Sequence, residues 1–279
     1  MILPGSASQS LAVALATELG EPLAPVEYDR FADGEQMVRA PFDAERAVIV
    51  ASTTSAAAHI ELLQLQNIAS RQATEVVTVL PYMGYGRQDA AFREGEPVSA
   101  RAMAQAISTS TDRVLVVNPH EPEVADQFEV PCESVDVAPR LSFPLPDELR
   151  EPLFLAPDAG ATALAEQVRD AYGGGSTDHF EKHRDPASGE ISMSPSAATV
   201  DGQDVVLVDD IIATGGTMSG AIDELDNPER VYVTCVHPVL VGNARTRLAR
   251  AGVAGVWGTD TVEQRVSAVS VAPSIAAQL

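Results

Sequence analysis

The fold is decided by the stretch VVLVDDIIATGGT, Val205 to Thr217, which joins a buried strand, an acidic pair and a glycine turn without a break. Val205 to Val208 is a continuous β-branched and aliphatic run, typical of a parallel strand buried on both faces. Asp209 and Asp210 follow at its carboxyl end, where open α/β sheets bind their ligands. The stretch predicts a parallel α/β sheet with a polar site at its edge.

The turn after the acidic pair has the composition of a phosphate site. Thr214, Gly215, Gly216 and Thr217 allow consecutive backbone amides to converge on an anion, and the next helix points its positive end at the same place. Carboxylates suit sugar hydroxyls, so the segment predicts a site for a phosphorylated sugar. The alternative is an ordinary strand, turn and helix with a solvated aspartate pair.

Other short aliphatic runs predict further strands, at residues 47–51, 76–80, 114–117, 153–156 and 231–236. Two helical patterns lie between them: His59 to Arg71 has apolar residues at helical spacing, and Pro97 to Ser108 begins with a proline suited to a first helical turn. Such alternation favours a doubly wound α/β fold with parallel sheets flanked by helices.

A proline-rich stretch, Val137 to Pro152, separates two blocks that each have this pattern. We expect two domains, residues 1–141 and 142–279. The segment GGGSTDHFEKHRDPASG, Gly173 to Gly189, lacks hydrophobic periodicity and is rich in loop residues. It predicts an irregular loop, either a functional flap or a surface excursion.

The charge balance is strongly acidic, with 40 acidic residues against 18 basic ones and a formal net charge of -22. Such a surface excludes broad nucleic-acid binding. Of the basic residues 17 are arginine, and Lys182 is the only lysine. Acidic excess with almost no lysine indicates a protein adapted to a salt-saturated cytoplasm, where ions screen self-repulsion.

This adaptation predicts stabilisation by salt. The melting temperature should rise between dilute buffer and molar potassium chloride, because screening removes repulsion among the acidic side chains. Thermal unfolding followed by circular dichroism at both salt concentrations measures the change. A melting temperature that does not rise would contradict the hypothesis.

The sequence also bears on compartment. Cys132 and Cys235 are too few for a disulfide framework and lack metal-ligand spacing, which favours a reducing cytoplasm. We expect no membrane span and no signal peptide, because the first residues lack a basic leader.

Two cations stand together in the segment EKHR. Lys182 and Arg184 are two residues apart, so on an extended backbone both would face the same side and suit a polyphosphate. A cation that stabilises charge on a transferring phosphoryl group is a recurrent catalytic element. The alternative is a solvated loop charge.

A histidine and an aspartate follow two other predicted strands. His120 lies in VLVVNPHEPE and Asp158 in LFLAPDAGAT, both at the ligand-binding rim of a sheet. Together they suit a divalent metal that bridges ATP phosphates. Each taken singly is more often a hydrogen-bonded loop residue.

Two N-terminal segments have the composition of a nucleotide site. In RFADGEQMVR, Phe31 suits stacking on a base, while Asp33 and Glu35 around Gly34 suit acceptance from its amino group. In PYMGYGRQD, the residues Arg87, Gln88 and Asp89 offer phosphate and ribose contacts. The alternatives are core packing for Phe31 and an ion pair for Arg87.

Taken in order, seven segments resemble the ribose-phosphate diphosphokinase family: FADGE, PYMGYGRQD, NPHEPE, APDAG, KHR, VDDIIATGGT and HPVLVGNA. The resemblance covers nearly the whole chain. It implies two tandem domains of the type I phosphoribosyltransferase fold, of which the second carries the sugar-phosphate loop. It also implies diphosphate transfer from Mg-ATP to the C1 hydroxyl of ribose 5-phosphate, with release of AMP.

The resemblance further implies a role for each matched residue. Asp33, Gly34, Glu35, Arg87, Gln88 and Asp89 would bind ATP, and Phe31 would stack on adenine from a neighbouring subunit of a homo-oligomer. His120 and Asp158 would hold magnesium. Lys182 would be the principal catalytic cation, assisted by Arg184, which would also contact ribose 5-phosphate. Asp209 and Asp210 would take the ribose hydroxyls, and Ala213, Thr214, Gly215, Gly216 and Thr217 would wrap the 5-phosphate.

The chain departs from the family pattern at Ala213, where many members have Asp, and at Ala90 and Ala91, where bacterial members have Arg. Inhibition by ADP and activation by phosphate, which the resemblance would otherwise imply, are therefore not assigned to this chain. Two rival functions remain: a phosphoribosyltransferase that consumes the sugar diphosphate, and a non-catalytic regulatory paralogue. FADGE, RQD and EKHR oppose the first, and the intact set of site residues opposes the second.

Overall fold

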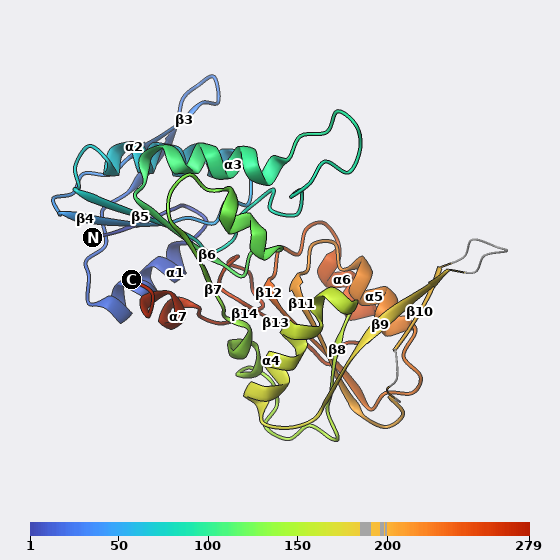
Figure 1. Ribbon diagram of the computed structural model, residues 1–279. Helices are drawn as coiled ribbons and strands as arrows, with labels where there is room; N and C mark the ends of the chain where they lie inside the picture. Colours follow the sequence, from blue (N-terminus) through green and yellow to red (C-terminus); the bar gives the residue numbers. More distant parts are fainter. Residues whose placement is uncertain (185–190, 196–197, 199) are drawn as a thin grey trace. The chain divides into compact units, whose positions relative to one another are not determined.

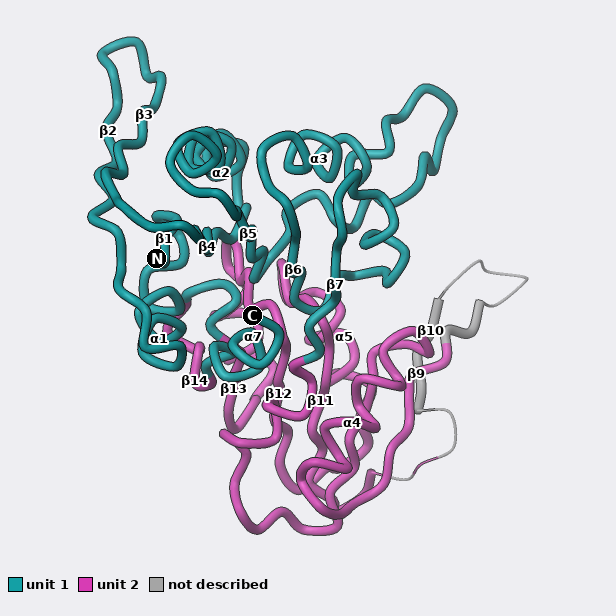
Figure 2. The backbone as a smooth tube through the Cα atoms, turned by 60° about the vertical axis from the view of Figure 1, so that its left-hand side comes forward, with its two compact units in different colours: residues 1–136, 260–263, 270–279 teal, residues 137–259, 264–269 magenta. Residues whose placement is uncertain are grey.

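The chain divides into two compact units, shown in teal and magenta in Figure 2. The computed structural model describes residues 1–184, 191–195, 198 and 200–279, with side chains described at 1–181, 198 and 200–279. Unit 1 comprises Met1–Asp136, Asp260–Glu263 and Ser270–Leu279, and unit 2 comprises Val137–Thr259 and Gln264–Val269. This division differs from the predicted 1–141 and 142–279 mainly at the C-terminus, where two short segments belong to unit 1.

Unit 1 is built on a parallel sheet of strand order β1-β4-β5-β6-β7. Its strands are β1 (Ile2–Pro4), β4 (Arg46–Val50), β5 (Glu75–Leu80), β6 (Arg113–Val117) and β7 (Cys132–Val135). Helices α2 (Ala56–Ala69) and α3 (Ser99–Ile107) cover one face, while α1 (Gln9–Leu19) and α7 (Ala272–Ala276) cover the other (Figure 1). The predicted strands at 47–51, 76–80 and 114–117 are confirmed, as are both predicted helices, although α3 begins at Ser99 and Pro97 therefore precedes it.

The core of unit 1 follows the alternation of the strands. Ala47, Ile49 and Ala51 point to the face that also receives Leu62 and Leu65 of α2. Neighbouring residues Val48 and Val50 are also fully buried, because helices lie on both faces. The aliphatic runs in the sequence are continuous because the strands are buried on both faces.

The C-terminal segments join unit 1 through contacts that the sequence does not reveal. The carboxylate of Glu263 accepts hydrogen bonds from the backbone amides of Ser10 and Leu11, at 2.6 and 3.1 Å, in the first turn of α1. A carboxylate at a helix amino end is favourable because it meets unpaired amides and the positive end of the dipole. The buried hydroxyl of Ser52 donates to the backbone oxygen of Thr261 at 2.5 Å. These contacts explain why residues 260–263 and 270–279 belong to unit 1.

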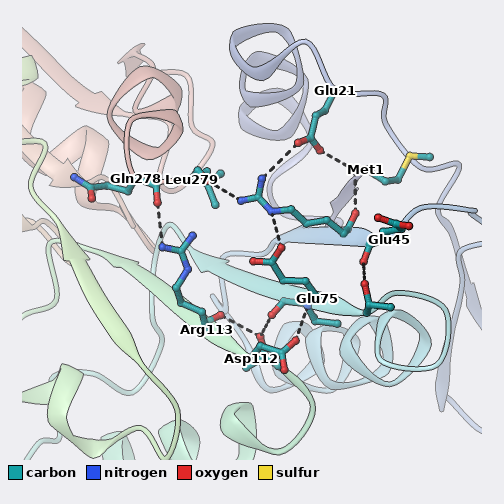
Figure 3. Close-up of polar contacts among 12 residues, drawn as sticks. Met1, Glu21, Glu45, Glu75, Asp112, Arg113, Gln278 and Leu279 are labelled. Carbon is teal, nitrogen blue, oxygen red and sulfur yellow. Dashed lines mark hydrogen bonds and ion pairs between the residues drawn. The ribbon is translucent and has the colours of Figure 1, made fainter.

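Two arginines, each the first residue of an inner strand of the same sheet, bind the last residues of the chain (Figure 3). Arg46 donates to the backbone oxygen of Leu279 at 2.9 Å, and Arg113 donates to that of Gln278 at 3.1 Å. Arg46 also forms ion pairs with Glu21 and Glu75, at 3.6 and 3.5 Å. The guanidinium of Arg46 thus links three separate segments of unit 1.

A two-stranded antiparallel hairpin extends from unit 1 (Figures 1 and 2). It consists of β2 (Glu27–Arg30) and β3 (Gln36–Arg39), and its tip is the predicted adenine segment. Gly34 has a φ of +95° at this tip, a left-handed conformation that glycine adopts without steric cost. The hairpin therefore presents residues 31–35 on a tight turn.

Unit 2 is built on a sheet of strand order β10-β9-β8-β11-β12-β13-β14, parallel except for the β9–β10 pair. Its strands are β8 (Leu153–Ala156), β9 (Ser176–Arg184), β10 (Ile191–Pro195), β11 (Asp204–Ile211), β12 (Arg230–His237), β13 (Gly255–Thr259) and β14 (Ser267–Val269). The flanking helices are α4 (Thr162–Tyr172), α5 (Gly216–Asp223) and α6 (Ala244–Arg250). The predicted strand of the opening motif is the central β11, between β8 and β12, so the α/β fold class is confirmed for both units.

One prediction for unit 2 is wrong. Residues 176–184, expected to lie in an irregular loop, form β9, which pairs in parallel with β8 and in antiparallel with β10. The sequence pattern does not predict this strand, because its residues are mostly polar. Its only apolar anchor is Phe180, which is 1% exposed and packs into the core beside Leu155.

Short 3₁₀ helices complete the described elements: η1 (Ser108–Ser110), η2 (Pro122–Gln127), η3 (Ala138–Ser142) and η4 (Ala159–Ala161). The longest described helix, α2, has 14 residues. Across the described residues, no helix is both long and apolar enough to cross a lipid bilayer.

Candidate active site

The acidic pair of the opening motif lies at the carboxyl end of β11, as predicted. Asp209 stands opposite Cys235 of β12, and both aspartates are partly buried. The amide of Asp210 donates to Oδ1 of Asp209 at 3.0 Å, and the amide of Ile211 donates to Oδ1 of Asp210 at 2.7 Å. Each carboxylate is therefore held against the backbone at the sheet edge.

The surroundings of Asp209 favour its protonated form. Burial raises the pKa of Asp209 to about 8, and the negative charges of Asp210 and Asp158 add to the rise. The sheet edge thus holds more negative charge than its surroundings stabilise. Such a site favours ligands that bring hydroxyl donors or positive charge.

This raised pKa predicts a pH-dependent stability. Between the unperturbed value of 3.8 and about 8, the folded state holds a proton on Asp209 that the unfolded state has lost. The free energy of unfolding should therefore fall as pH rises through this window, by up to about 1.4 kcal/mol per pH unit. Asp209→Asn should remove that contribution, so its stability relative to the wild type should increase from pH 5 to pH 8.

Urea unfolding of both proteins at several pH values, in molar potassium chloride with a metal chelator, measures the difference. A difference between variant and wild type that stays constant with pH would contradict the assignment.

The glycine turn continues directly into α5. Gly215 is buried and has a φ of +69°, and it precedes the first residue of the helix. A methyl group built on it would lie 3.4 Å from the backbone oxygen of Ala244 and 3.5 Å from Cγ of Leu248, in ordinary contact. The positive φ is therefore the main reason for glycine at this position. Ala213, Gly216 and the exposed Thr214 and Thr217 complete the predicted phosphate segment.

The segment after β12 forms backbone hydrogen bonds with the residues that lead into this turn. The amide of Leu240 donates to the backbone oxygen of Ile212, and the amide of Val241 donates to that of Ala213, both at 2.9 Å. The segment HPVLVGNA therefore holds the start of the glycine turn. Its hydrogen bond to the backbone oxygen fixes the backbone of Ala213, and this contact does not depend on the Ala213 side chain.

Asp158 lies at the end of β8, the strand next to β11. Its carboxylate accepts a hydrogen bond from the amide of Gly160 at 3.0 Å and caps η4. Its charge contributes to the raised pKa of Asp209. The structure thus brings Asp158, Asp209 and Asp210 together at one edge of the unit 2 sheet.

The predicted catalytic cations lie on β9. The backbone of Lys182 pairs with Met193 and that of Arg184 with Ile191, in the antiparallel ladder with β10. The segment is therefore extended, as the spacing argument requires. The side chains of both residues lie outside the described part of the structure.

The predicted adenine residues occupy the tip of the β2–β3 hairpin. The amide of Glu35 donates to Oδ1 of Asp33 at 3.0 Å, and the amide of Gly34 donates to the backbone oxygen of Phe31 at 2.9 Å. The Phe31 side chain is 52% exposed, which excludes the alternative that it packs in the core of this chain.

The second nucleotide segment lies in the loop between β5 and α3, residues 81–98. Arg87 is exposed, and its guanidinium has no ion pair or hydrogen bond within the described residues. Gln88 is tied to the start of α3, because Ser99 donates to its Oε1 at 2.5 Å and the amide of Ala100 to its backbone oxygen at 3.1 Å. Asp89 lines a depression shared with Arg101 and Asp126. The hairpin tip and this loop project from separate sides of unit 1, so a single chain does not bring them together (Figures 1 and 2).

The start of this loop is locked to the segment after β4. The amide of Gly84 donates to Oγ1 of Thr53 at 2.8 Å, and the amide of Thr53 donates to the backbone oxygen of Tyr82 at 2.9 Å. The ring of the next residue, Tyr85, lies 5.5 Å from that of the buried His59, whose pKa burial lowers. The sequence gives no sign of these contacts, which hold the base of the loop that carries Arg87.

His120 follows β6 in unit 1 and is exposed. Asp158, its predicted partner in metal binding, belongs to unit 2. Among the described side chains, no cluster of three or more His, Cys, Asp and Glu residues has the arrangement of a metal site.

The sequence and the fold match known proteins along the whole chain. Residues 1–110 match the model for the N-terminal domain of ribose phosphate pyrophosphokinase, and residues 141–264 match the phosphoribosyl transferase domain. The chain is 60% identical over 279 residues to the ribose-phosphate pyrophosphokinase of Halobacterium salinarum, with 99% of each chain covered.

The chain belongs to the ribose-phosphate pyrophosphokinase family.

Other members agree with this assignment. The Methanosarcina mazei ribose-phosphate pyrophosphokinase is 42% identical over 284 residues, covering 100% of this chain and 94% of the relative. Among solved structures, phosphoribosylpyrophosphate synthetase from Mycobacterium smegmatis superposes with a TM-score of 0.84 at 26% identity, covering 100% of this chain and 96% of that one. The predicted family and its two-domain α/β fold are therefore confirmed, and the chain is an enzyme of this family.

Proposed function

We propose that this protein transfers the β,γ-diphosphate of ATP to the C1 hydroxyl of ribose 5-phosphate, giving 5-phosphoribosyl 1-diphosphate and AMP for nucleotide biosynthesis. The observation that carries the proposal is the placement of Asp209, Asp210 and the glycine turn at one edge of the unit 2 sheet. A ribose 5-phosphate has a phosphate for the turn and vicinal hydroxyls for the carboxylates. Membership of the family supports the same reaction.

In this reaction the C1 oxygen attacks the β-phosphorus, and the bond between that phosphorus and the α,β-bridging oxygen breaks. Asp209 and Asp210 accept hydrogen bonds from the ribose hydroxyls, which fixes the direction of the C1 oxygen. The amides of Gly215, Gly216 and Thr217 hold the 5-phosphate, with Ala213 and Thr214 completing the turn. Lys182, assisted by Arg184, stabilises the negative charge that develops on the transferring group.

The ATP side of the site is assigned to unit 1. Arg87, Gln88 and Asp89 contact phosphate and ribose, while Asp33, Gly34 and Glu35 contact adenine, on which Phe31 stacks. We propose that the hairpin serves a neighbouring subunit of a homo-oligomer. The exposure of Phe31 and the separation of the hairpin tip from the 81–98 loop support this proposal.

We propose magnesium as the cofactor, with Asp158 and His120 as its protein ligands. The donor chemistry fits, because Asp158 shares the sheet edge with Asp209 and Asp210, where burial and the neighbouring negative charges raise the pKa of Asp209. Oxygen ligands are those that magnesium prefers. When bound, the ion neutralises charge on the ATP phosphates.

His120→Ala should raise the magnesium concentration needed for half-maximal activity by about tenfold, since substitutions at a metal site weaken metal affinity by about this factor or more. Activity titrated with magnesium at saturating substrates measures the change. Glu123→Ala, which removes an exposed carboxylate from the same segment, should leave the requirement unchanged. Equal magnesium curves for His120→Ala and the wild type would assign His120 a structural role.

We also infer a reducing, cytoplasmic location. Cys132 and Cys235 are both free, and Cys235 is fully buried. Burial raises the pKa of the Cys132 thiol to about 12, so neither cysteine has the features of a reactive thiolate.

Phosphorus NMR of the purified protein with ATP, ribose 5-phosphate and magnesium in molar potassium chloride tests the reaction. We expect AMP and a new sugar-linked diphosphate, and neither product when ribose 5-phosphate is omitted. ADP as the product would mean transfer of a single phosphoryl group. Absence of any reaction from folded protein would favour the regulatory paralogue.

A further inference from the structure

An arginine outside the predicted motifs lies beside the glycine turn. A methyl group built on Gly216 would lie 3.0 Å from Nη1 of Arg247 and 3.5 Å from Oγ1 of Thr214. A Cβ tilts toward the amino end of its helix, so this point lies at the beginning of α5. A guanidinium and a hydroxyl therefore border the same space, which Gly216 leaves open because it has no side chain.

The backbone of Arg247 is fixed in this position by the packing of α6. Ala244, Arg247 and Leu248 are spaced i, i+3 and i+4, which places them on one face of the helix. Ala244 is fully buried and Leu248 is 1% exposed, and both are the nearest neighbours of Gly215 in the turn. The face of α6 that supports the turn is thus the face that carries Arg247.

The guanidinium of Arg247 is available for a ligand. It forms neither an ion pair nor a hydrogen bond with any described residue, and the residue is exposed. Two other arginines of unit 2 bind carboxylates: Arg230 binds that of the buried Asp204 at 2.6 Å, and Arg150 lies 3.5 Å from Glu229. In a chain with 40 acidic residues, a cation without a carboxylate partner next to a glycine turn indicates an anionic ligand.

We propose that Arg247 binds the 5-phosphate of the sugar substrate, together with the hydroxyl of Thr214 and the amides of the glycine turn. The proposal rests on the proposed function, from which the phosphorylated sugar is taken. Arginine suits this role because its donors form a planar fork that matches phosphate oxygens, and hydrogen bonds between charged groups are stronger than neutral ones. Gly216 supports the role by leaving room where the two polar groups meet.

Binding of ribose 5-phosphate to the full chain, measured by titration calorimetry in molar potassium chloride, tests the proposal. Arg247→Ala should weaken binding by tenfold or more, and Arg247→Lys should recover part of the loss. Arg245→Ala is the matched control, since it removes the same charge from an exposed residue two positions from Arg247, on the opposite side of α6, and should leave binding unchanged. High salt screens general effects of net charge, so a difference between the two alanine variants reports local contact.

Turnover separates this role from a merely structural one. Arg247→Ala should raise KM for ribose 5-phosphate by tenfold or more while KM for ATP stays within about twofold of the wild type. Equal ribose 5-phosphate affinity in Arg247→Ala and Arg245→Ala would overturn the proposal. Wild-type protein that binds ribose 5-phosphate but forms no AMP would refute the proposed reaction, while the binding comparison would still decide the role of Arg247.

Discussion

Replacement of Lys182 by alanine is expected to lower turnover by on the order of a thousandfold or more, while the fold stays intact. The reason is charge: transfer of a diphosphoryl group concentrates negative charge near the β-phosphorus, and Lys182 is the only lysine in a chain that otherwise uses arginine. Lys182 lies on β9, in the strand pair with β10, so its backbone is part of the sheet of unit 2.

The effect on catalysis is measured as steady-state AMP formation at saturating substrates, with circular dichroism and ribose 5-phosphate binding as checks on the fold. Arg150→Ala is the control, because it removes an exposed cation of unit 2 that lies 3.5 Å from Glu229. It should leave turnover within about twofold of the wild type, since exposed ion pairs contribute little. Near-normal turnover of Lys182→Ala would remove the lysine from the mechanism.

Replacement of Gly84 by alanine is expected to disrupt the base of the 81–98 loop. A methyl group at this position would lie 2.0 Å from the backbone oxygen of Thr53, and because the clashing atom belongs to the backbone, a side-chain shift cannot relieve the clash. Overpacking of this kind costs about 2–3 kcal/mol of the free energy of unfolding. Because the loop carries Arg87 and Gln88, KM for ATP should also rise by about tenfold or more.

Gly86→Ala is the matched control within the same loop. Its added methyl would approach only the backbone oxygen of Met83, at 3.1 Å, which a shift of a few tenths of an ångström relieves. Urea unfolding and ATP titration of both variants measure the two effects. If Gly84→Ala were as stable as Gly86→Ala and kept the ATP affinity of the wild type, the contact with Thr53 would have no role in holding the loop.

The sequence predicted the parts of the fold that depend on local pattern. Val205–Val208 and the other aliphatic runs identified strands because a parallel strand buried on both faces must be apolar throughout. The acidic pair and the glycine turn were placed correctly because they follow such a strand directly. The family resemblance added the order of the remaining motifs along the chain.

Other features could not be predicted because they depend on tertiary contacts. β9 is polar along most of its length and is recognisable mainly by Phe180 and by its pairing with β8. The return of residues 260–263 to unit 1 depends on Glu263 capping α1, which lies more than 240 residues earlier in the chain. The sequence ARTRLAR does not predict a role for Arg247, because only the packing of α6 places this arginine beside Gly216.

Titration of ¹⁵N-labelled protein with ribose 5-phosphate, followed by amide NMR in molar potassium chloride, tests the central claim most directly. The claim is that Asp209, Asp210 and the turn at Gly215 and Gly216 form the sugar-phosphate site. We predict that the amide resonances of Gly215, Gly216 and Thr217 shift with saturation, and that ribose without its phosphate leaves them in place. Shifts confined to unit 1, with the three turn amides unmoved at saturation, would contradict it.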